Sequence, residues 1–224
     1  GIKEYQRAGG ALTSGGSLAT ISALVCARES FKVLYGGKDG QTLPQKFVIY
    51  MTDQTHSCAK KGLNLIGCGH LPIRYVPRDE KLRMIPAEFE KMVKDDAANG
   101  LVPWVVVLTA GTTNSGSIDP LKECTKLAKE NGLWVHIDGA YGALLNMCPE
   151  GKAAFGGNGA FAGADSIVAD PHKSLFLPFG TGMLIVPDGE LLKQTHSFTA
   201  PYLEKFVDSD ESSPADVSSE LSKH

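Results

Sequence analysis

The sequence predicts an α/β fold, in which a mainly parallel sheet carries helices on its faces. Three observations support this fold class. Segments with strand-like and helix-like patterns alternate along the chain. Residues 104–108, Trp-Val-Val-Val-Leu, are wholly apolar, which is typical of a central parallel strand covered on both sides. Small and polar residues follow several strand-like segments, as they do at the ligand-binding edge of open α/β sheets.

The first half of the chain contains the following predicted elements. A helix rich in Ala, Leu and Ile follows a glycine-containing loop, and a second amphipathic segment follows the first apolar strand. The third helix has Pro86 in its first turn and Asn99-Gly100 at its end, which are typical helix boundaries. In chain order we expect a helix at 17–35, a strand at 46–51, a helix at 55–66, a strand at 73–76 and a helix at 86–98.

The second half continues the alternation. After the apolar strand, a loop of small residues spans 109–116, and Asp119-Pro120 begins a helix that closes at Asn131-Gly132. Three further apolar segments are short enough to be buried strands. We expect these strands at 133–138, 166–169 and 182–186, with a loop between the first two.

Composition narrows the class of protein. The chain has 224 residues, of which 42% are hydrophobic and 21% charged, values typical of a soluble globular domain with a sizeable core. A net charge of −3 gives no indication of nucleic-acid binding. No apolar run is long enough to span a bilayer, and the sequence does not open with a signal-peptide pattern.

The cysteines favour a reduced, cytoplasmic protein. There are five, scattered and without a CxxC pair, which suits free thiols better than a disulfide framework. Cys58, Cys68 and His70 match no zinc-ligand spacing, so we expect no metal.

Two charged residues follow predicted strands and suggest chemistry. Lys173 lies in Pro171-His-Lys; a lysine that forms an imine must be held rigidly and be partly desolvated. Asp138 ends another strand, and a carboxylate beside a pyridine nitrogen keeps that nitrogen protonated, so that the ring accepts electrons. A surface lysine and a helix-capping aspartate are the structural alternatives.

Other polar features lie at the same predicted edge. The segment 13–20 opens a helix with small residues, where backbone N–H groups and the Ser17 hydroxyl suit a phosphate; a tight turn with a serine cap is the alternative. Thr112 and Thr113 offer hydroxyls to a phosphate or carboxylate, or cap the loop. His56 could stack on a cofactor ring, or be structural. Together these features are what an enzyme needs to hold pyridoxal phosphate covalently.

The motifs resemble the group II pyridoxal-phosphate-dependent amino acid decarboxylases, the family of aromatic amino acid, glutamate and histidine decarboxylases. The similarity runs from about residue 11 to residue 202. It rests on these segments in the family's order and spacing: Thr13-Ser-Gly-Gly-Ser17, Asp53-Gln-Thr-His-Ser57, Gly111-Thr-Thr113, His136-Ile-Asp-Gly-Ala-Tyr141 and Pro171-His-Lys173.

The resemblance implies a role for each site residue. Lys173 would be the Schiff-base lysine and Asp138 the partner of the pyridinium nitrogen. Ala140 would pack on one ring face and His56 would stack on the other. Tyr202 would be a mobile-loop tyrosine that protonates the substrate α-carbon. The phosphate would be held by Gly16, Ser17 and His172, with Thr113 close to it.

The resemblance also implies an architecture. The fold would be the aspartate-aminotransferase-like fold, fold type I, and the chain its large domain. We expect residues 1–200 to form an incomplete cofactor-binding domain and residues 201–224 to form a catalytic-loop segment with a polar tail. The family's N-terminal segment and C-terminal small domain would be absent. Family members are homodimers whose active sites take residues from both subunits.

The chain departs from the family at two positions. Asp170 stands where asparagine is common, and Ser174 stands where a bulky aromatic is common. An ionised Asp170 near a phosphate would repel it, so we expect this side chain to point away or to pair with a cation.

The expected function is decarboxylation of an L-amino acid to its amine and carbon dioxide. The alternatives are a carbon–carbon lyase, an aldehyde-forming oxidative decarboxylase, and a catalytically silent fragment or scaffold. The presence of both His56 and Tyr202 favours simple decarboxylation, because oxidative relatives typically lack one of them. Aromatic, acidic and small amino acids all remain open as substrates.

Overall fold

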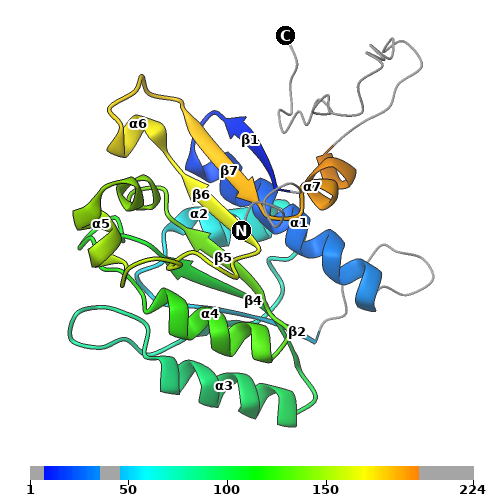
Figure 1. Cartoon of the computed structure of the whole chain (residues 1–224). Coiled ribbons are helices and arrows are strands. Elements are labelled where there is room, and N and C mark those ends of the chain that lie inside the picture. The colour runs from blue at the N-terminus through cyan, green and yellow to red at the C-terminus, as the bar shows by residue number, and fades with distance from the viewer. Residues whose placement is uncertain (1–7, 36–45, 197–224) are drawn as a thin grey trace, which may run out of the picture.

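The computed structural model describes residues 8–35 and 46–196 and shows one sheet with helices on both faces (Figure 1). The Tyr202 prediction and the whole 201–224 segment lie outside the described residues. The sheet has seven strands in the order β1-β7-β6-β5-β4-β2-β3. Their bounds are β1 Gly9–Thr13, β2 Phe47–Met51, β3 Ile73–Tyr75, β4 Val102–Thr109, β5 Trp134–Asp138, β6 Ser166–Ala169 and β7 Gly182–Val186.

The expected mainly parallel sheet is confirmed, with one reversal. Strands β2, β3, β4, β5 and β6 pair in parallel. Strand β7 pairs antiparallel with both β6 and β1, so β1 runs in the same direction as the parallel strands. The carboxyl ends of β1, β4, β5 and β6 therefore meet at one edge of the sheet.

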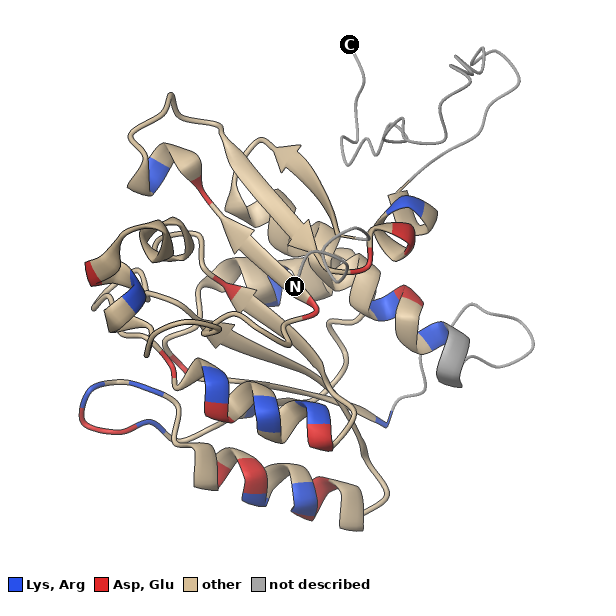
Figure 2. Ribbon diagram, in the orientation of Figure 1, with Lys and Arg blue, Asp and Glu red and all other residues tan. Residues whose placement is uncertain are grey.

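The helices form the two outer layers. Their bounds are α1 Gly16–Tyr35, α2 Ser57–Leu65, α3 Pro86–Ala98, α4 Leu121–Glu130, η2 Ala143–Met147, α5 Pro149–Ala154, α6 Pro171–Ser174 and α7 Gly189–His196. One core cluster joins the sheet to α1, α2 and α7, and the other joins it to α3 and α4. Figure 2 shows basic and acidic residues interspersed along α3 and α4.

Strand β2 shows how the sequence builds both layers. Phe47, Ile49 and Met51 belong to the first core cluster, while Val48 and Tyr50 belong to the second. Successive side chains of a strand point to opposite faces, and a strand buried on both sides is apolar throughout. Each of the five residues of β2 is buried.

The structure adds elements that the sequence did not predict. Strand β1 lies in a segment for which the sequence predicts no strand. Gly9 and Gly10 are poor strand formers, and pairing with β7 overrides that local preference. The loop expected after β5 contains η2 and α5, and the Pro-His-Lys turn is the short helix α6. The remaining predicted strands and helices are present, with ends shifted by a few residues.

Membrane-spanning helices and metal-binding clusters are both absent from the described residues. No helix there combines the length and the apolar character that a bilayer span requires. No group of three His, Cys, Asp or Glu side chains in the described ranges is placed to hold a metal ion.

Candidate active site

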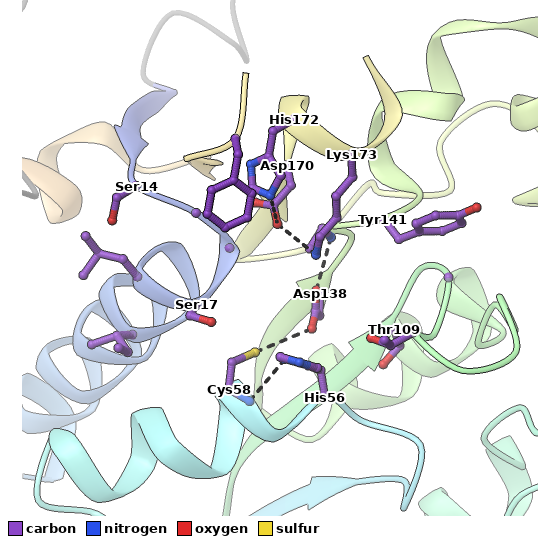
Figure 3. A pocket seen from close by; sticks show the side chains of 18 residues that line it. Ser14, Ser17, His56, Cys58, Thr109, Asp138, Tyr141, Asp170, His172 and Lys173 are labelled. Carbon is purple, nitrogen blue, oxygen red and sulfur yellow. Dashed lines mark hydrogen bonds and ion pairs between the residues drawn. The ribbon is translucent and has the colours of Figure 1, made fainter. Parts of the chain in front are cut away.

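A pocket of about 670 Å³ lies at the carboxyl edge of the sheet, between the start of α1, the start of α2 and α6 (Figure 3). Eight of the sequence-predicted residues line it: Gly16, Ser17, His56, Thr113, Asp138, Ala140, His172 and Lys173. Segments far apart in the sequence thus meet at one place, as expected for the edge where parallel strands end.

Lys173 reaches this pocket from α6. The helix begins directly after β6, with Asp170 at its N-cap and the buried Pro171 as its first residue. Proline fixes the backbone there and holds the lysine's point of attachment. The Lys173 Nζ atom lies 2.9 Å from Asp170 Oδ2, and the lysine side chain is 41% exposed while that of Asp170 is 2% exposed. The expectation that Asp170 pairs with a cation is confirmed.

Asp138 lies on the neighbouring strand, β5. Its backbone pairs with Val168 of β6, and its side chain is buried at the pocket floor. The Ala140 N–H donates to Asp138 Oδ1 at 3.1 Å. His136, two residues earlier, is fully buried, and burial lowers its pKa, so this ring is neutral near pH 7. Asp138 therefore receives no positive charge from His136.

The thiol of Cys58 completes the floor. Its Sγ atom lies 3.9 Å from Asp138 Oδ2 and 3.7 Å from Thr20 Oγ1. Burial, followed by the charge of Asp138, raises the pKa of Cys58 to about 11, so the thiol stays protonated at neutral pH. Sequence reasoning considered Cys58 only as a metal ligand. Its place two residues after His56, at the start of α2, was the available signal.

The start of α1 forms a second wall. Gly15 has a φ of +144°, which favours glycine. A Cβ atom on Gly16 would lie 2.8 Å and 2.9 Å from the two carboxylate oxygens of Asp170, so only glycine fits there. The first backbone N–H groups of a helix have no partner within the helix, and they favour an anion.

His56 enters from the start of α2. It is the N-cap of this helix, and its Nδ1 accepts a hydrogen bond from the Cys58 N–H at 3.3 Å. Because Nδ1 is the acceptor, a neutral His56 carries its proton on Nε2. His56 therefore has a structural role as a cap as well as a ring at the pocket.

His172 is oriented by the strand that runs against the others. Its Nδ1 lies 2.6 Å from the carbonyl oxygen of Thr181, just before β7, so Nδ1 carries a proton and donates. Its ring centroid lies 5.1 Å from that of Phe179, which also lines the pocket. Its Nε2 lies 3.8 Å from Asp170 Oδ2.

The two threonines after β4 have different positions. The Thr112 hydroxyl lies 2.7 Å from Ser115 Oγ and accepts from the Ser117 N–H, so it orders the loop. Thr113 lines the pocket. The capping reading is therefore confirmed for Thr112, and only Thr113 remains a candidate for ligand contact.

The comparisons with known proteins decide the family. The family model described as the pyridoxal-dependent decarboxylase conserved domain matches residues 2–220. The chain belongs to the pyridoxal-dependent decarboxylase family. Membership in this family confirms the resemblance found in the sequence. The cofactor of the family is pyridoxal phosphate.

Individual relatives of this decarboxylase family agree. An aromatic-L-amino-acid decarboxylase of Bacillus atrophaeus is 34% identical over 87% of this chain, and tryptophan decarboxylase 2 of Oryza sativa is 32% identical over 87%. The structure of Oryza sativa TDC with PLP and tryptamine matches with a TM-score of 0.82 at 30% identity, over 93% of this chain and 42% of that one. The chain spans 38% of the length of both curated relatives.

The pocket of this family member fits the cofactor. Lys173 would supply an amine for its aldehyde, Asp138 would supply a carboxylate for its ring nitrogen, and the start of α1 would suit its phosphate. The expected fold type I architecture is confirmed by the same structural match.

Proposed function

We propose that this chain is the core of an enzyme that decarboxylates an L-amino acid to the corresponding amine, using pyridoxal phosphate. The observation that carries the proposal is the position of Lys173 and Asp138. They come from the ends of neighbouring parallel strands and line one pocket. A lysine and a carboxylate in this arrangement serve the aldehyde and the ring nitrogen of one cofactor.

The cofactor, when bound, supplies an electron sink for the charge that develops at the substrate α-carbon. Asp138 would keep the ring nitrogen protonated, and the Ala140 N–H fixes the carboxylate for that task. Lys173 would bind the aldehyde carbon and release it to the substrate amine. Gly16, Ser17 and His172 would hold the phosphate, with Thr113 beside it.

Proton delivery to the substrate is the remaining task. His56 would lie over the cofactor ring, and its Nε2 proton is available because Nδ1 is engaged by the backbone. Ala140 would support the opposite face. Tyr202 would return the proton to the α-carbon after carbon dioxide leaves.

We also propose that the enzyme is a homodimer. Large apolar side chains are exposed on the loop after α6, including Phe176 at 92% and Phe179 at 94% exposure. Phe176 also has a φ of +55°, which is costly for an aromatic residue. Ser174 Oγ donates to the Tyr141 carbonyl at 2.7 Å and so connects this loop to a second exposed apolar segment, which contains Tyr141, Leu145 and Met147. A second copy of the chain would cover this surface beside the pocket.

A cytoplasmic location is part of the proposal. The five cysteines are free, and four of them are buried. This pattern suits a reducing compartment.

An aldehyde-forming oxidative decarboxylation is the second candidate. It is favoured by the structural match to Rhodiola rosea 4-hydroxyphenylacetaldehyde synthase, at 31% identity and a TM-score of 0.73. The presence of His56 at the pocket argues for simple decarboxylation.

The test is a panel of carboxyl-labelled L-amino acids, covering aromatic, acidic and small side chains. The proposal predicts carbon dioxide and an equal amount of amine from at least one of them, without peroxide. Aldehyde with peroxide would support the oxidative candidate. Absence of turnover by a folded, cofactor-loaded enzyme across the panel would contradict both.

A further inference from the structure

The ion pair between Asp170 and Lys173 is unusual in its burial. The Asp170 side chain is 2% exposed, and its Oδ2 atom lies 2.9 Å from Lys173 Nζ. Its other oxygen, Oδ1, is buried without a hydrogen-bond partner. A buried carboxylate with one free oxygen is costly, so its place here needs a reason beyond packing.

The helix α1 supplies an electrostatic reason for an ionised Asp170. The carboxylate approaches Gly16, at the first turn of α1, closely enough that a Cβ atom there would collide with it. The first turn of α1 contains no acidic residue. The start of a helix attracts a negative charge, so the Asp170 carboxylate lies where an anion is stabilised.

The other titratable groups around the pair are few. From α6 itself, His172 Nε2 lies 3.8 Å from the same oxygen that Lys173 contacts. The start of α1 contributes Gly16 and Ser17, which do not titrate near neutral pH. From the opposite walls, the titratable groups that line the pocket are His56, Cys58, Asp138 and Tyr141.

We propose that Asp170 is the counterion of Lys173, a positioning residue that holds the Lys173 ammonium group at the pocket. This inference rests on the proposed function. Lys173 must lose a proton before Nζ can attack an aldehyde carbon, so the ion pair with Asp170 keeps the amine unreactive until the pair separates.

The ion pair also bears on the phosphate. An ionised Asp170 at the start of α1 would compete with a phosphate for the helix end and repel it. Pairing with Lys173 offsets that negative charge.

The experiment is competitive acetylation of the full, cofactor-free chain with isotopic acetic anhydride across a pH series, read peptide by peptide by mass spectrometry. Only a neutral amine reacts. Asp170→Asn removes the counterion and frees the Lys173 amine, so Lys173 should react faster, on the order of tenfold near pH 8.

The chain contains a matched control. Lys91 Nζ lies 2.8 Å from Asp95 Oδ2 on α3, at nearly the same distance, but both side chains are exposed, at 69% and 60%. Asp95→Asn should change Lys91 labelling by no more than about twofold, because exposed pairs are weak. Superimposable Lys173 curves for wild type and Asp170→Asn would overturn the proposal.

A second measurement covers the case in which Asp170→Asn folds poorly. Lys173→Met leaves the buried carboxylate without its partner and should lower the urea midpoint at pH 7. The double variant Lys173→Met/Asp170→Asn should recover most of that loss, since both charges are gone. If the urea midpoint of the double variant were no higher than that of Lys173→Met, the stabilising ion pair between Asp170 and Lys173 would be contradicted.

The proposed function and the inference about Asp170 can be contradicted independently of each other. Acetylation and urea unfolding are measured without cofactor or substrate. A chain that lacks turnover but shows the Asp170-dependent labelling shift would leave this inference standing. A chain that decarboxylates but shows no shift would remove it alone.

Discussion

Cys58 Sγ lies 3.9 Å from Asp138 Oδ2, so a buried thiol contacts the carboxylate proposed to partner the cofactor ring. Burial raises the pKa of Cys58 to about 11, and the charge of Asp138 contributes to the rise. We expect slow alkylation of Cys58 by iodoacetamide at neutral pH, increasing by about tenfold per pH unit toward that value. The exposed Cys148 is the internal reference.

Replacement of the carboxylate tests the contact. Asp138→Asn removes the negative charge, so Cys58 alkylation should begin at lower pH while Cys148 is unchanged. Equal rates for Cys58 and Cys148 at pH 8 in the wild-type chain would show that the thiol is not held as described.

His56 combines two roles that one substitution can separate. Asparagine also caps helices, so His56→Asn should keep the cap on α2 and lose the ring. We expect turnover to fall by about tenfold or more, because a ring that orients the reacting groups is missing. The thermal midpoint should remain near wild type.

His56→Ala is the comparison, because it removes ring and cap together. It should lose activity and also about 1 kcal/mol of stability. If His56→Asn kept full activity, the ring would have no part in the reaction.

Asp119 stabilises the loop beside the pocket. Its Oδ1 accepts from the Met84 N–H and its Oδ2 from the Thr109 N–H, at 2.7 Å and 2.8 Å. An amide at this position turns one acceptor into a donor that faces a backbone donor. Asp119→Asn should therefore lower the free energy of unfolding by about 1–3 kcal/mol at pH 7, measured by urea denaturation.

The same residue predicts a pH dependence. Burial raises the pKa of Asp119 to about 6. The folded state therefore binds this proton more tightly than the unfolded state, and the resulting stabilisation is present below about pH 4 and lost as the pH rises through about 6. Wild type should thus be more stable relative to Asp119→Asn at pH 5 than at pH 7. If the stability difference between wild type and Asp119→Asn were larger at pH 7 than at pH 5, the direction of this pH dependence would be contradicted.

Sequence reasoning placed most of the sheet, because buried parallel strands are apolar throughout and stand out from their flanks. It missed β1, whose pairing with β7 joins segments more than a hundred and fifty residues apart and leaves no local signal at Gly9-Gly10. Motif order identified eight of the 18 residues that line the pocket. It did not foresee the Cys58 contact with Asp138, since contacts between α2 and β5 depend on how the layers pack.

The exposed aromatic residues of the loop after α6 are predicted to contribute to the dimer interface. Phe176→Ser and Phe179→Ser should each weaken the dimer, on the order of tenfold or more, because truncation of a central aromatic costs about 2 kcal/mol at an interface. Sedimentation velocity over a concentration series measures this. Tyr75→Ser is the control, since Tyr75 is 51% exposed on β3, at the opposite edge of the sheet from β1 and β7. An unchanged assembly in both phenylalanine variants would contradict the proposed interface.

The presence of Lys173 and Asp138 in one cofactor-binding pocket is the central claim, and one measurement tests it most directly. The chain is incubated with pyridoxal phosphate, reduced with borohydride and mapped by mass spectrometry. The account predicts visible absorption before reduction and a single adduct on Lys173, lost in Lys173→Met and kept in the exposed α2 variant Lys60→Met. An adduct spread over surface lysines, or unchanged by Lys173→Met, would show that this pocket does not hold the cofactor.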